Sequence, residues 1–309
     1  MATLKELSKK EELLSQGHRM CAGCVAPVVV RQVLQATDSP VVVGCATGCL
    51  EVSTTIFPYS AWKVPFIHNA FENVSATISG VETAYRSLKK QGKIAEDKKI
   101  KFVAFGGDGG TYDIGLQSLS GAMERGHDFL YVCYDNGAYM NTGIQRSSAT
   151  PLGAETTTSP AGKEMPGKGQ NRKDLTAIAA AHNIPFVAQA SPSHWKDLHQ
   201  KAKKGLEAEG PAFLNVLAPC PRGWRYEADE GIELARLAVE TCYWPLFQIT
   251  DGKYTLSYQP KEKRPVLDWL KRQGRFKHLF KKENESVVLK LQEEIDKEWD
   301  SLLKQCESK

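Results

Sequence analysis

Two groups of oxygen-bearing residues in the first half of the chain have the types and spacing of a metal-binding site. Asp108 stands between two pairs of glycines in the stretch G-G-D-G-G, and Asn136 and the backbone carbonyl of Ala138 follow 28 to 30 residues later. Mg²⁺ prefers oxygen ligands in octahedral geometry, and a diphosphate held through it also needs backbone N–H donors close by. These residues therefore predict a site for a diphosphate bound through a divalent cation.

The glycines beside Asp108 allow such a close approach. Gly107, Gly109 and Gly110 carry no side chain, and the helix expected after them would direct its positive N-terminus at the phosphates. No G-x-G-x-x-G occurs here, and the lysine and hydroxyl of a P-loop are missing. The glycines alone leave a plain tight turn as the alternative.

Four of the eight cysteines form a second candidate set. Cys21 and Cys24 make a C-x-x-C pair, Cys49 ends the stretch A-T-G-C, and Cys220 follows an apolar run. Four thiolates suit a [4Fe-4S] cluster or a structural zinc ion, and the spacing leaves both open. Cys45 competes with Cys49 as a ligand. The other thiols are expected to be structural: Cys133, Cys242 and Cys306.

Four apolar runs predict buried parallel strands that would position these groups. They are residues 41–43, 102–105, 129–134 and 213–217. After the glycine turn a helix is expected, with Asp113 as its N-cap, Gly126 as its stop and one apolar face, made of Ile114, Leu116, Leu119 and Met123. The predicted fold is an open, mostly parallel α/β sheet with helices on both faces and sites at the carboxyl ends of the strands.

Two further segments differ from this pattern. Residues 150–173 are rich in Pro, Gly, Thr and Lys and predict a long ordered loop or a partner contact. Near the C-terminus, one helix face carries Val288, Leu291, Ile295, Trp299 and Leu302. We expect this face to pack on the chain itself rather than on a neighbouring subunit. The predicted organisation is a cofactor-binding domain, residues 1–240, and a C-terminal extension, residues 241–309.

Composition limits the function classes. The 309 residues are 41% hydrophobic, and the 40 basic and 36 acidic residues are mixed, with a net charge of +4. No basic block indicates nucleic acid, and no signal peptide or apolar run near 20 residues indicates a membrane. The expected location is the cytoplasm, where clustered cysteines more often bind metal than form disulfides.

The G-D-G stretch with Asn136 downstream resembles the thiamine diphosphate motif, in which Mg²⁺ holds the diphosphate. Six stretches then extend the resemblance over nearly the whole chain, to the beta subunits of pyruvate:ferredoxin oxidoreductase (pyruvate synthase), in the 2-oxo acid:ferredoxin oxidoreductase family. They are Q-G-H-R-M-C-A-G-C (16–24), A-T-G-C-L-E-V-S-T (46–54), H-N-A-F-E-N (68–73), F-G-G-D-G-G-T-Y-D-I-G-L-Q-S-L-S-G (105–121), Y-M-N-T-G-I-Q-R-S (139–147) and T-C-Y-W-P-L (241–246).

The resemblance implies roles for the matching residues. Asp108, Asn136 and the Ala138 carbonyl would hold Mg²⁺, and Asn141 would face the thiazolium and the substrate. The [4Fe-4S] ligands would be Cys21, Cys24, Cys49 and Cys220. Thr47, Gly48 and His68 are further candidates for contact with the cofactor.

The resemblance also implies a reaction and partners. Thiamine diphosphate would support decarboxylation of a 2-oxo acid, electrons would leave through the cluster to ferredoxin, and coenzyme A would take the acyl group. The glutamate that contacts the aminopyrimidine ring would come from an alpha subunit, and gamma and ferredoxin-like delta subunits would complete the complex.

Alternatives remain at this point. Within the family, the substrate is pyruvate, oxalate or another 2-oxo acid. A zinc-stabilised α/β binding protein is a different class, distinguished by the lack of visible absorption. A thiamine decarboxylase without a redox step would leave the cysteines unexplained.

Overall fold

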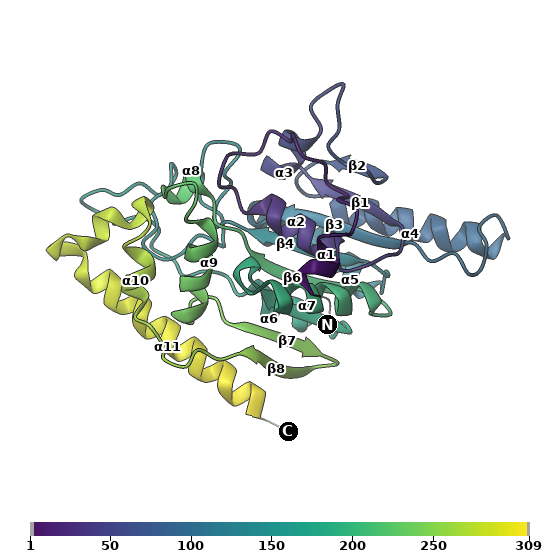
Figure 1. Cartoon of the computed structure of the whole chain (residues 1–309). Helices are drawn as coiled ribbons and strands as arrows, with labels where there is room; N and C mark the ends of the chain where they lie inside the picture. Colours follow the sequence, from purple (N-terminus) through teal and green to yellow (C-terminus); the bar gives the residue numbers. More distant parts are fainter. Residues whose placement is uncertain (1–2, 308–309) are drawn as a thin grey trace.

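A twisted sheet of eight strands forms the centre of the computed structural model, which describes residues 3–307 (Figure 1). The strand order is β2-β1-β3-β4-β6-β5-β7-β8, and only β7 and β8 run antiparallel to their neighbours. The strands are β1 (Val41–Ala46), β2 (Phe66–Asn69), β3 (Lys101–Gly107), β4 (Leu130–Asp135), β5 (Phe186–Ala190), β6 (Ala212–Leu217), β7 (Leu246–Thr250) and β8 (Lys253–Tyr258).

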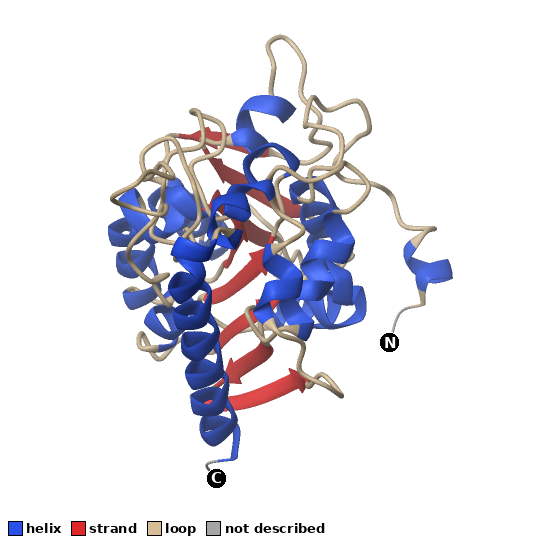
Figure 2. Cartoon of the chain, turned by 90° about the vertical axis from the view of Figure 1, so that its left-hand side faces the viewer, coloured by secondary structure: helices blue, strands red, loops and turns tan. Residues whose placement is uncertain are grey.

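Helices cover both faces of this sheet (Figure 2). One core cluster packs α2 (Ala26–Leu34) and α7 (Trp195–Glu207) against one face. The other cluster packs the second face against α4 (Val74–Lys90), α5 (Leu116–Glu124), α6 (Leu175–Ala180), α9 (Gly231–Glu240), α10 (Val266–Leu270) and α11 (Glu285–Glu307). The predicted fold class is confirmed.

Side chains of β4 alternate between these two clusters, as the pleat of a strand requires. Val132 and Tyr134 belong to the α2 and α7 side, whereas Tyr131 and Cys133 belong to the opposite side. Cys133 is fully buried, as expected for a structural thiol. Both faces of β4 are therefore apolar, which explains the continuous apolar run in its sequence.

The four predicted strands correspond to β1, β3, β4 and β6. The other four were not predicted, because they are short and carry polar residues. β8 alternates between exposed and half-buried residues, as is typical of an edge strand.

The region after Asp108 corrects two predictions. A π-helical turn, η1 (Gly109–Ile114), separates β3 from α5, whose N-cap is Gly115 and not Asp113. The Asp113 carboxylate instead accepts hydrogen bonds from the backbone N–H, at 3.0 Å, and the hydroxyl of Ser148. The placing of Ile114 on the apolar face was also wrong, since Ile114 is 56% exposed. The wider π-helical turn shifts the helical phase before α5. The stop is confirmed, since Gly126 adopts the left-handed conformation after α5.

The C-terminal helix packs on the body of the chain, as expected. Leu291, Ile295, Trp299 and Leu302 of α11 are buried in the same cluster as the strands. Residues 150–173 form a loop, since no helix or strand element lies between β4 and α6. Short segments complete the described chain: α1 (Leu4–Leu7), α3 (Cys49–Thr54), α8 (Pro221–Trp224), η2 (Pro192–His194), η3 (Gly274–Phe280) and η4 (Lys282–Asn284). Between residues 3 and 307, no helix is both long and apolar enough to cross a membrane.

Candidate functional site

A pocket at the carboxyl ends of β1, β3 and β4 brings together most of the predicted cofactor residues. They are Thr47, Gly48, Gly107, Gly109, Gly110, Asn136, Ala138 and Asn141, and the pocket also takes in Cys49. The parallel register explains this, because β1, β3 and β4 lie side by side and end at one edge.

Three oxygen atoms converge beneath this pocket. The carboxamide end of Asn136 places one atom 2.9 Å from Asp108 Oδ1 and 2.8 Å from the Ala138 carbonyl oxygen. As an NH₂ group this atom donates to both oxygens, whereas as Oδ1 it completes a group of three acceptors. Adjacent oxygens of an octahedral Mg²⁺ site lie about 2.9 Å apart, given Mg–O distances of about 2.0 to 2.1 Å. The three atoms thus fit the ligand set predicted from the sequence.

The environment of Asp108 favours a bound cation. Burial raises the pKa of its carboxyl well above the usual value, and the charge of Asp135 raises it further. Hydrogen bonds from Ser147 and the Asn136 backbone N–H offset only part of this. A divalent ion in contact with Asp108 would compensate the buried charge.

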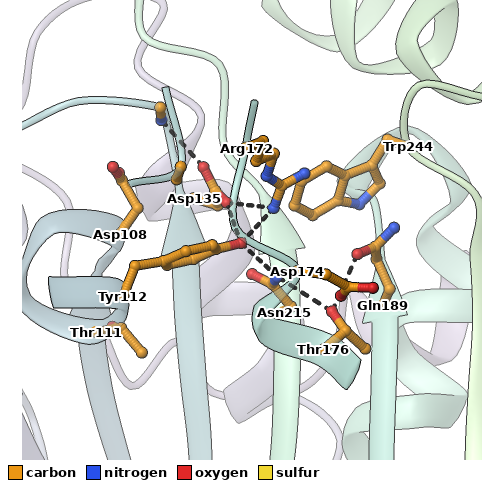
Figure 3. Close-up of polar contacts among 12 residues, drawn as sticks. Asp108, Thr111, Tyr112, Asp135, Arg172, Asp174, Thr176, Gln189, Asn215 and Trp244 are labelled. Atoms are coloured by element: carbon orange, nitrogen blue, oxygen red, sulfur yellow. Dashed lines mark hydrogen bonds and ion pairs between the residues drawn. The ribbon is translucent and has the colours of Figure 1, made fainter. Parts of the chain in front are cut away.

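Asp135 fixes the turn that carries Asn136 and Ala138. Its Oδ1 accepts the Gly137 N–H at 3.0 Å, and its Oδ2 accepts from Tyr112 at 2.6 Å and from Arg172 at 2.7 Å. In Figure 3 the Arg172 guanidinium lies between this carboxylate and the indole of Trp244, 4.3 Å from the ring centre. The buried charge of Asp135 is therefore paired with Arg172, and Asp135 anchors the turn of Asn136 and Ala138 through the Gly137 N–H.

Gly109 shows why the glycine stretch admits no side chains. A Cβ built there would lie 2.4 Å from the ring of Tyr139, whose hydroxyl donates to the Gly109 carbonyl at 2.8 Å. The absence of a Cβ thus lets Tyr139 close one side of the pocket.

The four predicted thiols form a single group. Each is close enough to the others to influence their ionisation: burial raises the pKa of Cys24 and of Cys49 to about 12, and the neighbouring thiols add to the shift. Burial also raises the pKa of Cys220, with a contribution from Cys21. Thiolates in such surroundings need a compensating positive centre.

Cys45 is excluded from this group. It lies in β1, fully buried in the apolar cluster under α2 and α7, and its Sγ donates to the carbonyl of Ala46. Burial raises the pKa of Cys45, with Glu51 and not the four thiols as the further cause. The structure therefore separates Cys45 from Cys49, which spacing alone did not.

The thiol group does not have the geometry of a one-ion site. Between residues 3 and 307, no three His, Cys, Asp or Glu side chains lie close enough together to hold a single metal ion. Sulfurs around tetrahedral zinc would be about 3.8 Å apart, given Zn–S distances of about 2.3 Å. A [4Fe-4S] cluster places each thiolate on a different iron and so holds the thiolates farther apart than a single ion does.

The three oxygens of Asp108, Asn136 and Ala138, called the oxygen site below, are linked to the thiol group by a hydrogen bond. Trp224, in the short helix after Cys220, donates from its indole N–H to the Asn136 carbonyl at 2.6 Å. Cys49 lies both among the thiols and in the lining of the pocket.

Two predicted residues lie at the margin. His68 is outside the pocket lining, 62% exposed in its side chain, and its Nδ1 lies 2.6 Å from the buried carboxylate of Glu51. Asn141 lines the pocket mouth and is exposed. Both roles stay predictions.

Several residues at the site were missed from the sequence, among them Phe71, Tyr139, Met140 and Thr142 of the pocket lining. Ser147 donates to Asp108 from 39 residues away, and Tyr134 lines the pocket at the end of β4. Ser147 ends the stretch 139–147 quoted above, but its contact with Asp108 could not be read from the sequence, because a loop sets its approach. Tyr134 was overlooked although its strand carries the predicted Asn136 turn.

Comparison with known proteins places this site in a family. Residues 43–216 match the model "Thiamine pyrophosphate enzyme, C-terminal TPP binding domain", which spans the sheet from β1 to β6 and contains the oxygen site. Over 97% of its length, the chain is 54% identical to the pyruvate synthase subunit PorB of Thermotoga maritima, of which the match covers 94%. The chain belongs to the PorB family of pyruvate synthase subunits.

Other relatives agree with this placement. The PorB protein of Methanocaldococcus jannaschii is 53% identical over 90% of this chain and 93% of its own length. The ketoisovalerate oxidoreductase subunit VorB of Pyrococcus abyssi is 44% identical over 96% of this chain and 94% of its own length. The chain is thus an enzyme subunit of the thiamine diphosphate-dependent 2-oxo acid:ferredoxin oxidoreductase class, and the resemblance noted in the sequence is confirmed.

A solved structure shares the fold at low identity. The 2-oxoglutarate:ferredoxin oxidoreductase of Magnetococcus marinus has a TM-score of 0.56 and 20% identity, over 74% of this chain and 81% of that one. Membership in the family supports thiamine diphosphate as the cofactor and removes the binding-protein alternative, in which the glycine turn has no ligand.

Proposed function

We propose that the chain is the beta subunit of a pyruvate:ferredoxin oxidoreductase. The overall reaction converts pyruvate and coenzyme A to acetyl-CoA, CO₂, a proton and two electrons, which pass through a [4Fe-4S] cluster to ferredoxin. The observation that carries the proposal is the position of Cys49, which belongs to the thiol group and lines the same pocket as Asn136 and the glycines. The thiamine diphosphate site and the iron-sulfur cluster would thus be neighbours.

The chain's own residues hold the diphosphate end of the cofactor. Asp108, Asn136 and the Ala138 carbonyl would ligate Mg²⁺, while the backbone of Gly107 and Gly109 approaches the phosphates. When bound, thiamine diphosphate would supply the electron sink that decarboxylation of a 2-oxo acid requires.

The thiols would supply the electron exit. Cys21, Cys24, Cys49 and Cys220 would each bind one iron of a [4Fe-4S] cluster, which accepts one electron at a time. Cys21 is exposed whereas Cys220 is buried, so the cluster would extend from the pocket wall towards the surface.

The site is completed by other chains. An alpha subunit would provide the glutamate against the aminopyrimidine ring and cover Asn141, which is exposed here. Gamma and ferredoxin-like delta subunits would carry electrons outward to ferredoxin in the cytoplasm. Within the chain, residues 1–240 form the cofactor-binding domain and residues 241–309 its C-terminal extension.

A branched 2-oxo acid is the second candidate substrate. The observation that favours it is the 44% identity to a ketoisovalerate oxidoreductase subunit. The identity to the PorB proteins is higher, which favours pyruvate. Oxalate is a third possibility within the same chemistry.

The visible spectrum of the anaerobic complex tests the proposal. We expect a broad cluster absorption near about 400 nm that bleaches when pyruvate and coenzyme A are added together. Bleaching by ketoisovalerate or oxalate but not by pyruvate would change the substrate. A colourless complex with full metal content would contradict the cluster.

A further inference from the structure

The hydroxyl of Tyr134 is a buried donor without an acceptor among the described residues. Tyr134 is 1% exposed, and within the part of the chain that the structure describes its hydroxyl donates to no acceptor, although the backbone N–H of Leu50 points at its oxygen. Buried hydroxyls in folded proteins are nearly always paired, because an unpaired one loses its hydrogen bonds to water without compensation. The unpaired hydroxyl therefore marks the place of a partner that belongs to the working enzyme.

Other tyrosines at this end of the sheet provide a comparison. The Tyr131 hydroxyl lies 2.9 Å from the hydroxyl of Thr111, Tyr112 donates to Asp135 at 2.6 Å, and Tyr139 donates to Gly109 at 2.8 Å. The protein thus satisfies its hydroxyls in this region and leaves Tyr134 as the exception.

Tyr134 is directed at the pocket by two glycines. A Cβ built on Gly48 would lie 2.9 Å from the Tyr134 hydroxyl oxygen, and one on Gly107 would lie 3.4 Å from it. The hydroxyl therefore lies between the loop that follows β1 and the carboxyl end of β3. The ring packs in the same buried cluster as Phe105 and Val132, and Tyr134 also lines the pocket.

The chemistry of this wall indicates what the hydroxyl meets. Gly107, Gly109 and Gly110 offer backbone N–H donors, and Asp108 would hold a cation, so the occupant of this wall is anionic and rich in acceptors. Tyr134 is a donor at neutral pH. The hydroxyl forms no hydrogen bond with Cys49, the residue after Gly48.

We infer that the Tyr134 hydroxyl donates a hydrogen bond to an oxygen of the bound diphosphate, and this inference rests on the proposed function. Tyr134 is then a cofactor-binding residue that leaves a buried hydroxyl unpaired in the cofactor-free protein.

The test compares Tyr134→Phe with Tyr131→Phe in the assembled complex, after the cofactor has been removed with a magnesium chelator. Calorimetry would measure the binding of inorganic pyrophosphate and of thiamine diphosphate, each with excess Mg²⁺. For Tyr134→Phe we expect both affinities to fall by about tenfold, since a hydrogen bond to a charged acceptor is lost. The melting temperature of the cofactor-free complex should stay unchanged or rise, because no hydrogen bond is lost in it.

Tyr131→Phe should give the opposite result. It loses the bond to Thr111, so the melting temperature should fall while both affinities stay within about twofold of wild type. This contrast separates binding from a general packing role.

Two outcomes would overturn the inference. Equal pyrophosphate affinity in Tyr134→Phe and wild type would exclude the contact with the diphosphate, whether or not thiamine diphosphate binds more weakly. A lower melting temperature without any loss of affinity would make the hydroxyl structural. Failure of the wild-type complex to bind thiamine diphosphate would instead refute the proposed function.

Discussion

At the level of single residues, Asp108 is a buried carboxylate placed for a cation. Replacing it with alanine removes the only side-chain anion of the predicted ligand set. We expect Mg²⁺-dependent binding of thiamine diphosphate to weaken at least about a hundredfold, as for loss of a charged ligand in a buried site. The fold should remain, because burial already disfavours the ionised form. Calorimetry and circular dichroism would check the two parts.

Asp113→Ala is the matched control for this variant. Asp113 lies in the same turn but bonds Ser148 rather than the oxygen site. It should lower stability and keep cofactor affinity. Normal cofactor occupancy in Asp108→Ala would show that the oxygen site is not the metal site.

We expect serine substitutions at Cys220 and at Cys45 to have opposite effects on the cluster signals. Cys220→Ser should remove or weaken the cluster absorption and the low-temperature electron paramagnetic resonance signal of the reduced complex, because one iron loses its thiolate. Cys45→Ser should keep both signals and lower the free energy of unfolding by about 1 to 2 kcal/mol, because it places a hydroxyl in an apolar cluster. A Cys45→Ser complex without its cluster would reverse the assignment of Cys45 and Cys49.

At the level of elements, the loop of residues 150–173 depends on one buried lysine. Lys168 is 2% exposed, and its ammonium donates to the carbonyls of Thr150 at 2.6 Å, Ser148 at 3.2 Å and Asn171 at 3.3 Å. It joins both ends of the loop to the segment beside Ser147, which bonds Asp108. The loop therefore holds, from outside the sheet, the segment whose Ser147 bonds Asp108.

Lys168→Met should open this loop. Three buried carbonyls lose a charged donor, so we expect the free energy of unfolding to fall by about 2 to 3 kcal/mol. Hydrogen exchange of residues 150–173 should increase more than that of the strands. Equal protection of the loop in the variant would show that other contacts hold it.

The same lysine predicts a pH dependence. Burial lowers the pKa of Lys168 to about 8, and Arg146 lowers it further, whereas an unfolded lysine has a pKa of about 10.4. Between these values the unfolded chain binds more protons than the native one, so this group makes stability rise with pH. The stability of wild type relative to Lys168→Met should therefore increase from pH 8 to about 10. If the difference in stability between wild type and Lys168→Met stays flat or decreases over this range, the pKa of Lys168 is not lowered in the folded protein.

At the level of the whole molecule, the C-terminal helix α11 packs on the sheet and shares its hydrophobic core. Trp299 is 8% exposed in the cluster that includes the sheet. Trp299→Ala should cost about 3 kcal/mol, as expected for a large buried side chain. Denaturant unfolding would measure it, with Leu289→Ala on the exposed face of the same helix as the control, within about 0.5 kcal/mol of wild type. Equal losses in both variants would mean that α11 is not docked as described.

The sequence alone determined the features that depend on local signals. Four strands were visible as apolar runs, and Asp108 and Asn136 were expected to meet because parallel strands end at one edge of a sheet. The C-x-x-C pair and the amphipathic pattern of α11 were equally local. The family resemblance added the roles of Cys49 and Cys220, which spacing by itself left open.

Tertiary structure decided the features that depend on distant packing. The π-helical turn moved Asp113 from a helix cap to a bond with Ser148, because backbone geometry after Asp108 cannot be read from helical period. Burial separated Cys45 from Cys49, and the approach of a loop brought Ser147 to Asp108. The unpaired hydroxyl of Tyr134 could emerge only once every neighbouring donor and acceptor had a position, since satisfaction of buried polar groups is a property of the packed whole.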